Sequence, residues 1–436
     1  MKELSEITAL FVDHGGLYQP LAECLARTYK RVIYHDPCEE AFPTVNKAVI
    51  GETFPSNERL EVVREFWPLK REIDLCVFPD SQGAGLQAEL LGQGKPVWGS
   101  LGSCDIEHDR EKFIGLLKEN GFAVPPYEKV IGVSALREHL KDKTDKRVKV
   151  SRYRGTMETY HWRDYGQDGA WLDWLSVLLG GVKDLLPFLV FDSVDNTLEI
   201  GGDTYCIMGK WPNLMLDGFE WKDKGYYAAL KKREDMPEPS KRVLEAFGPI
   251  LKECGHMNFW SMEIIVSDGE FYFLDPTPRG PIPGSASQIA LYTNLPKIIA
   301  AGAEGECLDP EAAGEYSAEC ALSLKPANKP PVWDSAMIPN ELKEYVMLSG
   351  YCTVKDRQWF PPSDHHEEGI GWICAVGDTP SETIEKVVEL AKLLPDGIHA
   401  NTDSLVHLLK EIHESEAKGI EFSKDVVPEP ETVVSD

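Results

Sequence analysis

Hydrophobic and polar positions in the first hundred residues alternate between short apolar runs and amphipathic stretches. Apolar runs with the length and composition of buried β-strands lie at residues 8–12, 32–34, 74–78 and 95–99. Stretches whose apolar residues are spaced as in a helix lie at 20–31, 57–71 and around 86–90. Because strands and helices alternate, this part of the chain predicts a parallel sheet with helices on both faces.

The pattern changes after residue 105. Helical spacing at 109–121 and 134–140 precedes a strand signal at 147–150. Strand signals then dominate, at 186–191, 197–208 and 256–274, with one clear helix at 240–254. The last predicted elements are strands at 318–324 and 371–376, separated by a Pro- and Lys-rich linker at 325–331, and a helix at 382–394. The pattern therefore predicts an α+β region behind the α/β domain.

These changes divide the chain into four predicted parts. An N-terminal α/β domain spans 1–105, a larger α+β domain spans 106–315, and a small C-terminal α+β domain spans 316–410. The remainder, 411–436, carries eight acidic residues against two lysines and contains the run Pro-Glu-Pro-Glu. Such a composition favours solvation over packing, so we expect an acidic, flexible tail.

Composition narrows the classes of function. The chain has 436 residues, 42% of them hydrophobic and 27% charged, which suits a globular protein of several packed units. Its formal net charge of −27 repels phosphate backbones and anionic lipids, so we expect neither nucleic-acid binding nor membrane attachment. No apolar run approaches the ~20 residues that cross a bilayer, and the first residues lack a signal-peptide pattern. The expected location is the cytoplasm.

The stretch 262–279 carries the candidate chemistry. Two apolar runs flank an Asp-Gly turn, which predicts a hairpin. Glu263 lies in the first run, and the second ends in polar residues at intervals of two, which share one face of a strand: Asp275, Thr277 and Arg279. These residue types suggest a metal site with an arginine beside it.

The length of the turn decides whether the two carboxylates meet. A two-residue turn sets Glu263 opposite Leu274, whereas a loop of three or five residues brings Glu263 and Asp275 onto one face. A metal site needs the second arrangement, and we predict it. Two close carboxylates repel each other unless a cation lies between them, and hard oxygen ligands beside a phosphate-directed arginine suit magnesium on a nucleotide.

The spacing of an acid, eleven residues, a second acid, and then a polar residue and an arginine at intervals of two resembles the metal-binding signature of the ATP-grasp superfamily of carboxylate–amine ligases. The domain order is similar too: a small α/β domain, a lid-like subdomain, here at about 125–190, and a larger subdomain with an acidic hairpin, here at 257–279. The run 369–382 is similar to the closing domain of glycinamide ribonucleotide synthetases. The resemblance implies a two-subdomain ATP-grasp fold followed by a small β-rich segment.

The same resemblance implies an enzyme that uses ATP and Mg²⁺, with Mn²⁺ as a substitute. It would join a small carboxylate to an amine through an acyl phosphate and release ADP and phosphate. Its partners would be these small molecules, and homodimers are common in the family. Carried over by position, the ATP-binding residues are Lys112, Lys149, Arg154, Phe191, Asp192, Glu199 and Lys224. The metal ligands are Glu263, Asp275 and Thr277, and Arg279 is the catalytic residue that holds the phosphoryl group.

Two departures from the family's pattern keep a second interpretation open. Family members usually have Asn in place of Thr277 and Glu in place of Asp275, and both residues here still offer oxygen ligands. The loop 151–156 has one glycine and two arginines where the family is glycine-rich, although arginine forks can bind phosphate. The alternative function is therefore a non-catalytic nucleotide-binding or scaffold protein with the same fold. A kinase-like phosphoryl transfer without ligation is a third.

Overall fold

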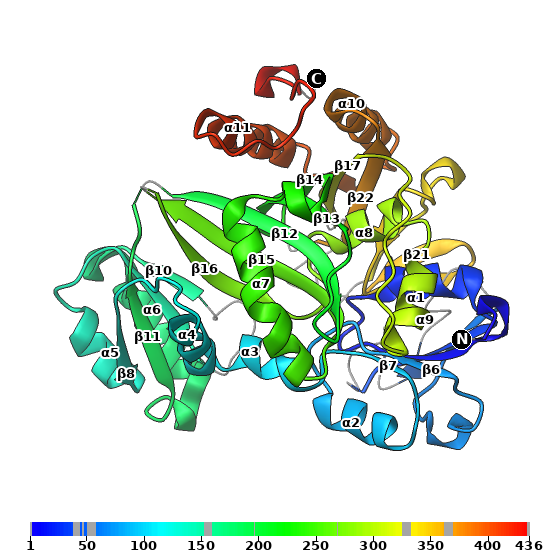
Figure 1. Cartoon of the computed structure of the whole chain (residues 1–436), viewed down its shortest axis with the longest axis horizontal. Helices are drawn as coiled ribbons and strands as arrows, with labels where there is room; N and C mark the ends of the chain where they lie inside the picture. The colour runs from blue at the N-terminus through cyan, green and yellow to red at the C-terminus, as the bar shows by residue number, and fades with distance from the viewer. Residues whose placement is uncertain are drawn as a thin grey trace. The chain divides into compact units, whose positions relative to one another are not determined.

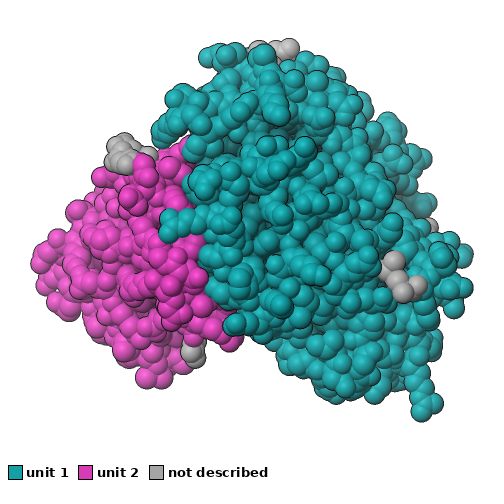
Figure 2. Space-filling model, viewed as in Figure 1, with its two compact units in different colours: residues 1–103, 200–262, 277–436 teal, residues 104–199, 263–276 magenta. Residues whose placement is uncertain are grey.

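The computed structural model of the chain describes residues 2–37, 44–45, 48–49, 58–151, 159–195, 197–267, 269–324, 333–361 and 369–433. It is a mixed α/β structure that divides into two compact units (Figures 1 and 2). Unit 1 comprises residues 1–103, 200–262 and 277–436, and unit 2 comprises residues 104–199 and 263–276. Within the described ranges, no helix is both long enough and apolar enough to span a membrane.

Unit 1 contains the predicted N-terminal parallel sheet, which is confirmed. Its strand order is β5-β2-β1-β6-β7. The strands are β1 (Thr8–Val12), β2 (Arg31–His35), β5 (Leu60–Val62), β6 (Leu75–Val77) and β7 (Val97–Trp98). The short strands β3 (Thr44–Val45) and β4 (Ala48–Val49) pair with each other, and the helices of this region are α1 (Gln19–Thr28) and α2 (Ala84–Gly92).

Both faces of this sheet are covered, which explains why its strands are apolar throughout. Ala9 and Phe11 of β1 belong to a core cluster that includes residues of α1 and α9 (Leu295–Ala303). The alternate residues, Leu10 and Val12, belong to a second cluster together with Leu90 of α2. Successive residues of a strand point to opposite faces, so a strand without polar positions needs apolar neighbours on both sides.

The helix predicted at 57–71 is wrong. Leu60–Val62 form the edge strand β5, which pairs with β2, and Glu61 of β5 forms an ion pair with Arg31 of β2. Pro68 lies inside the predicted helix, and a proline disfavours the helical conformation of the residue before it. The partner strand that favours an extended conformation here is distant in sequence, so local spacing could not reveal it.

A larger sheet in unit 1 has the order β15-β12-β13-β14-β17-β22-β19, and β23 also pairs with β17. Its strands are β12 (Leu198–Ile207), β13 (Leu214–Trp221), β14 (Gly225–Lys232), β15 (Met257–Ser267), β17 (Tyr316–Leu324), β19 (Val346–Leu348), β22 (Gly371–Gly377) and β23 (Ile398–Ala400). Helix α7 (Glu238–Glu253) lies against β15 (Figure 1). Its Phe247 packs against Trp260 of β15, with ring centroids 5.8 Å apart. Helices α8 (Ser285–Leu291) and α10 (Pro380–Ala391) contact β17 and β22.

The C-terminal part of unit 1 adds a three-stranded sheet in the order β18-β21-β20. Its strands are β18 (Asp334–Ala336), β20 (Cys352–Val354) and β21 (Arg357–Phe360). Because β17 and β22 continue the larger sheet, the segment from residue 316 onward shares a sheet with strands β12 to β14. The predicted strands at 318–324 and 371–376 are thus confirmed as elements of that sheet.

The residues described beyond 410 do not form the flexible tail that the sequence predicts. Helix α11 (Asp403–Ala417) runs across this boundary, and Phe422 behind it is only 1% exposed. The Phe422 ring lies 5.7 Å from that of Phe219 and 5.3 Å from that of Tyr227. Burial of an aromatic side chain stabilises this packing against the solvation that the acidic composition favours.

Unit 2 contains a four-stranded antiparallel sheet in the order β10-β9-β11-β8. Its strands are β8 (Tyr127–Ile131), β9 (Lys146–Val150), β10 (Thr159–Trp162) and β11 (Pro187–Asp192). Its helices are α3 (Cys104–His108), α4 (Arg110–Glu119), α5 (Val133–Leu140) and α6 (Tyr165–Leu179), and α5 and α6 share a core cluster with the sheet. The end of β15 and most of β16 (Glu270–Thr277) also belong to this unit.

The packing of the C-terminal segment can be tested with one buried and one exposed residue. We expect Phe422→Ala to lower the free energy of unfolding by about 3–5 kcal/mol, because it empties a site between aromatic rings. Val426, four residues on, is 88% exposed. Val426→Ala should therefore change the free energy of unfolding by less than about 0.5 kcal/mol. Urea unfolding of both variants measures the difference. An equal, small effect of both substitutions would contradict the burial of Phe422.

Candidate functional site

Strands β15 and β16 are hydrogen-bonded neighbours, so the predicted hairpin is confirmed. Positions 268 and 269 lie between Ser267, the last residue of β15, and Glu270, the first of β16, and the predicted longer loop stays a prediction. Asp268 lies outside the described residues, and Gly269 has a φ of +86°, which glycine adopts without strain and which permits a short turn.

Glu263 and Asp275 act on each other through their charges. Burial raises the pKa of Glu263, and the charges of Asp275 and Glu199 raise it further. Burial also works to raise the pKa of Asp275, but Arg110 and Lys149 outweigh it and hold that pKa below its usual value. The arrangement therefore favours one negative charge, on Asp275, with the proton retained by Glu263.

Lys149 reaches this acid pair because of its place on β9. Val148 and Val150 are buried in the core of unit 2, so the alternation of a strand turns Lys149 to the opposite face. Its Nζ lies 2.6 Å from Oδ2 of Asp275, and the side chain is 11% exposed. The predicted strand lysine, Lys149, is thus almost buried and forms an ion pair with Asp275, a predicted metal ligand.

Arg110 is the second cation on Asp275, and sequence reasoning missed it. It lies on the buried face of α4 together with Phe113, Ile114 and Leu117. Its Nη1 donates to Oδ1 of Asp275 and, at 3.2 Å, to the carbonyl oxygen of Leu274. The signal was available, because the spacing of these four residues is that of an apolar helix stripe. An arginine on such a stripe is buried and needs an acidic partner.

Lys112, which the resemblance assigns to ATP binding, has no contact with this acid pair among the contacts that the structure describes. Its side chain is 45% exposed and its Nζ pairs with Asp105 at 3.1 Å. The structure therefore brings Lys149 and Arg110, but not Lys112, into contact with Asp275. The register of the helix decides the matter, since residues 110 and 112 differ by about 200° around its axis.

Phe191, Asp192 and Glu199 stand at and beyond the end of β11. The Phe191 ring is buried against Tyr127, with centroids 5.2 Å apart, and Asp192 pairs with Lys146 at 2.7 Å. Glu199 is exposed, and its charge contributes to the raised pKa of Glu263. Glu199 is thus close enough to Glu263 to act on it through its charge. The contacts of Phe191, Asp192 and Glu199 with a nucleotide stay a prediction.

The donor set of the acid pair fits a divalent cation with oxygen preference. In the described part of the chain, no group of three or more His, Cys, Asp and Glu side chains is arranged to hold a metal ion. Both oxygens of Asp275 instead receive a cationic group, from Arg110 and Lys149. A cation between Glu263 and Asp275 would remove the repulsion that raises the pKa of Glu263, so the residues suit Mg²⁺ once Glu263 has lost its proton.

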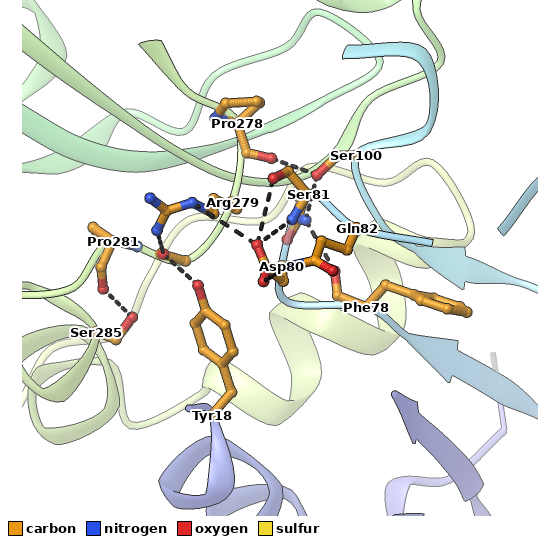
Figure 3. Close-up of polar contacts among 12 residues, drawn as sticks. Tyr18, Phe78, Asp80, Ser81, Gln82, Ser100, Pro278, Arg279, Pro281 and Ser285 are labelled. Carbon is orange, nitrogen blue, oxygen red and sulfur yellow. Dashed lines mark hydrogen bonds and ion pairs between the residues drawn. The ribbon is translucent and has the colours of Figure 1, made fainter. Parts of the chain in front are cut away.

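Arg279 belongs to unit 1, where it lies beside Asp80 (Figure 3). Its Nε is 3.9 Å from Oδ1 of Asp80, and its Nη1 donates to the carbonyl oxygen of Gly280 at 3.0 Å. The main-chain N–H of Ser81 donates to the same Asp80 oxygen at 2.7 Å. A guanidinium held in this way presents a planar fork of donors that suits phosphate or carboxylate oxygens.

Asp80 is a second residue that sequence reasoning missed. It follows β6 at the carboxyl end of the parallel sheet, which is where open α/β sheets bind ligands. Asp13 follows β1 in the same way, Asp36 follows β2, and all three are buried. Burial raises the pKa of Asp13 to about 7, although Tyr34 donates a hydrogen bond to it. An acid after each of three neighbouring strands was a visible signal.

Thr277 and Lys224 have no described contact with Asp275 or with Asp80. Thr277 is the half-buried last residue of β16. Lys224 lies in the turn between β13 and β14, where its main-chain N–H donates to Trp221 and its carbonyl oxygen accepts from Ala321. Arg154 lies outside the described residues. The roles of all three stay predictions.

No protein-family model matches the chain, and a comparison with curated proteins finds no match. Solved structures do match it over almost its whole length. A phosphoribosylamine–glycine ligase from Thermotoga maritima matches with a TM-score of 0.64 and 15% identity, over 90% of this chain and 99% of its own. A biotin carboxylase from Campylobacter jejuni, solved as a β,γ-ATP complex, matches with a TM-score of 0.61 and 14% identity, over 96% and 98%.

A third structure is the biotin carboxylase domain of the Hydrogenobacter thermophilus 2-oxoglutarate carboxylase, solved as a dimer with MgADP, ADP and bicarbonate. It matches with a TM-score of 0.62 and 11% identity, over 95% of this chain and 96% of its own. The chain has the ATP-grasp fold. This fold confirms the expected architecture. At 11–15% identity, the likeness to these structures shows the fold alone.

The contribution of Arg110 can be separated from that of Lys112. We expect Arg110→Met to lower the free energy of unfolding by on the order of 3 kcal/mol, because it removes a buried cation from the half-buried Asp275 carboxylate while keeping apolar contacts. Lys112→Met removes an exposed pair and should change it by less than about 1 kcal/mol. Urea unfolding at neutral pH compares the two. A larger loss for Lys112→Met would contradict the assignment.

The protonation of Glu263 predicts how stability depends on pH. The folded chain binds this proton more tightly than the unfolded chain, so the contribution of Glu263 to stability declines as pH rises above its ordinary pKa of 4.5. Glu263→Gln should therefore raise the melting temperature of the ligand-free protein more at pH 8 than at pH 5. Thermal unfolding across this range measures it, and a pH-independent difference would contradict the raised pKa.

Proposed function

We propose that the protein is an ATP- and Mg²⁺-dependent ligase that joins a small carboxylate to an amine. An oxygen of the substrate carboxylate attacks the γ-phosphorus of ATP, which forms an acyl phosphate and releases ADP. The amine nitrogen then attacks the acyl carbon, phosphate leaves with the bonding electron pair, and the amine proton passes to solvent. The products are an amide, ADP and phosphate.

The acid pair Glu263 and Asp275, placed on adjacent strands and flanked by Lys149 and Arg110, is the observation that supports this proposal most. Catalysis of this kind depends on positioning and charge neutralisation, and it needs no nucleophilic side chain. A divalent cation held by the two carboxylates would supply neutralisation of phosphate charge. Mn²⁺, another cation with oxygen preference, is proposed as a substitute.

Each cation of the cluster has a proposed role. Lys149 is almost buried and pairs with Asp275. When its Nζ leaves Asp275, it is positioned to bind a phosphate oxygen. Arg110 stays on Asp275 and orients that carboxylate, because it is 4% exposed and also held by the carbonyl oxygen of Leu274. Arg279, whose guanidinium is restrained by Asp80, is proposed to hold the transferring phosphoryl group.

One observation favours the second candidate, a non-catalytic nucleotide-binding or scaffold protein. Both oxygens of Asp275 are engaged by Arg110 and Lys149, and a divalent cation must displace at least one of these groups. If neither moves, the fold binds a nucleotide without a metal and does not transfer phosphate. A homodimer is a further proposal, supported by the dimer of the Hydrogenobacter thermophilus domain.

Binding and turnover are tested with a variant pair on one hairpin. We expect MgATP at about a hundred times its dissociation constant to stabilise the natural protein by about 2.7 kcal/mol. Glu263→Gln should lose the magnesium-dependent part of this shift and all release of ADP, since it removes a charged ligand. Glu270→Gln is the matched control, because Glu270 lies on the same hairpin and is exposed.

Thermal-shift titrations of ATP with and without magnesium measure binding, and a coupled assay of ADP release with small acids and amines measures turnover. A Glu263→Gln variant that keeps the full magnesium effect would overturn the metal assignment. Nucleotide binding without any magnesium effect in the natural protein would favour the scaffold interpretation.

A further inference from the structure

A cavity of about 190 Å³ lies within unit 1 and has no role in the site described so far. Its walls are mostly apolar, and they come from the start of α1, from the segment 282–289 and from β19 and β22. Representative lining residues are Leu21, Ile282, Ile289, Met347 and Trp372. An apolar cavity of about 150 Å³ is large enough for a benzene molecule, so this one accommodates a side chain of isobutyl or phenyl size.

The cavity is continuous with the segment that carries Arg279. Gly280 follows Arg279 directly, and Ile282 and Ser285, a few residues on, line the cavity. Tyr18 connects the cavity with this segment. It lines the cavity, and its hydroxyl donates to the carbonyl oxygen of Gly280 at 2.7 Å (Figure 3). A molecule in the cavity would therefore contact the same segment that positions the arginine.

This segment is anchored at both ends by buried hydrogen bonds. Glu319, fully buried on β17, accepts from the N–H of Gly284 and from that of Ser287, each at 2.6 Å. At the other end the N–H of Gly280 donates to the carbonyl oxygen of Pro79 at 2.9 Å. A wall held in this way is organised before a ligand arrives, which is what a pocket needs to discriminate between ligands.

The polar groups of the cavity indicate which charge its ligand carries. Asp223 is exposed and is the charged residue among those that line it, and Ser285 and Ser349 add hydroxyls. No lysine, arginine or histidine of the described chain lines this cavity. A phosphate group would find no cation there, whereas an ammonium group is attracted by Asp223.

We propose that the cavity is the specificity pocket for the amine substrate, and that this substrate is a small unphosphorylated amine or amino acid with an apolar side chain. The apolar group fills the cavity, and Asp223 attracts the cationic end. This inference rests on the proposed ligase function and names its substrate class. It differs from the phosphoribosyl substrate that the name of the Thermotoga maritima ligase indicates for that protein.

The test uses the full-length protein and four probes: L-leucine, L-phenylalanine, glycine and ribose 5-phosphate. Isothermal titration calorimetry is done without nucleotide and then with ADP and magnesium. We expect L-leucine or L-phenylalanine to bind at least about tenfold more tightly than glycine, because the apolar side chain adds contacts worth that factor. Ribose 5-phosphate should not bind.

Two variants locate the binding. Leu17 lines the cavity and is 50% exposed, so Leu17→Trp can narrow the pocket without disturbing the core, and it should weaken the apolar probe about tenfold. Leu185 is 73% exposed and lies in unit 2, so Leu185→Trp is the matched control and should change nothing. Asp223→Asn keeps the positive φ of +59°, which asparagine tolerates, and should weaken binding of the amine by a similar factor.

The outcomes separate this inference from the function on which it rests. Tighter binding of glycine or ribose 5-phosphate, or equal binding to the natural protein and Leu17→Trp, overturns the pocket assignment. If no probe binds to a protein that still binds MgATP through Glu263, the pocket assignment fails while the ligase proposal stands. If MgATP does not bind but L-leucine binds in a Leu17-dependent way, the ligase proposal fails and the cavity is a site for apolar amines alone.

Discussion

The neutralisation of Asp275 is the constraint on which the candidate site depends. A carboxylate so placed cannot stay charged without partners, because burial penalises its ionised form. Arg110 and Lys149 supply two cationic partners, one from the first turn of a helix and one from a central strand of the four-stranded sheet. Glu263 then becomes the acid that keeps its proton, so one carboxylate pair holds two different charge states.

The fold of unit 2 creates this balance from simple patterns. Val148 and Val150 of β9 pack in the core of the unit, and strand alternation leaves Lys149 on the other face. The buried stripe of α4 turns Arg110 inward beside Phe113, whose ring meets Phe273 of β16 edge-on at 5.2 Å. The aromatic contact fixes the helix against the strand that carries Asp275. The proposed binding site therefore uses contacts that also stabilise the fold, and a ligand that draws Lys149 away from Asp275 must replace its charge.

Much of this arrangement was predictable from the sequence, because it follows from local periodicity. The resemblance pointed to Lys149, which alternation along β9 sets opposite the core valines, and the Asp-Gly turn between apolar runs predicted the hairpin. Other features depend on distant partners. The edge strand β5 forms because it pairs with β2, which lies far from it in the sequence. Phe422 packs because aromatic residues far away in the sequence surround it.

A crystal structure of the protein with MnADP tests whether Glu263 and Asp275 hold a metal ion, because the anomalous signal of manganese locates the ion without reference to activity. We expect a manganese ion bound by the carboxylates of Glu263 and Asp275, with the Nζ of Lys149 moved from Asp275 to a phosphate oxygen and Arg110 still in place. Manganese bound away from both carboxylates, or a nucleotide bound while Lys149 remains on Asp275, would contradict this expectation.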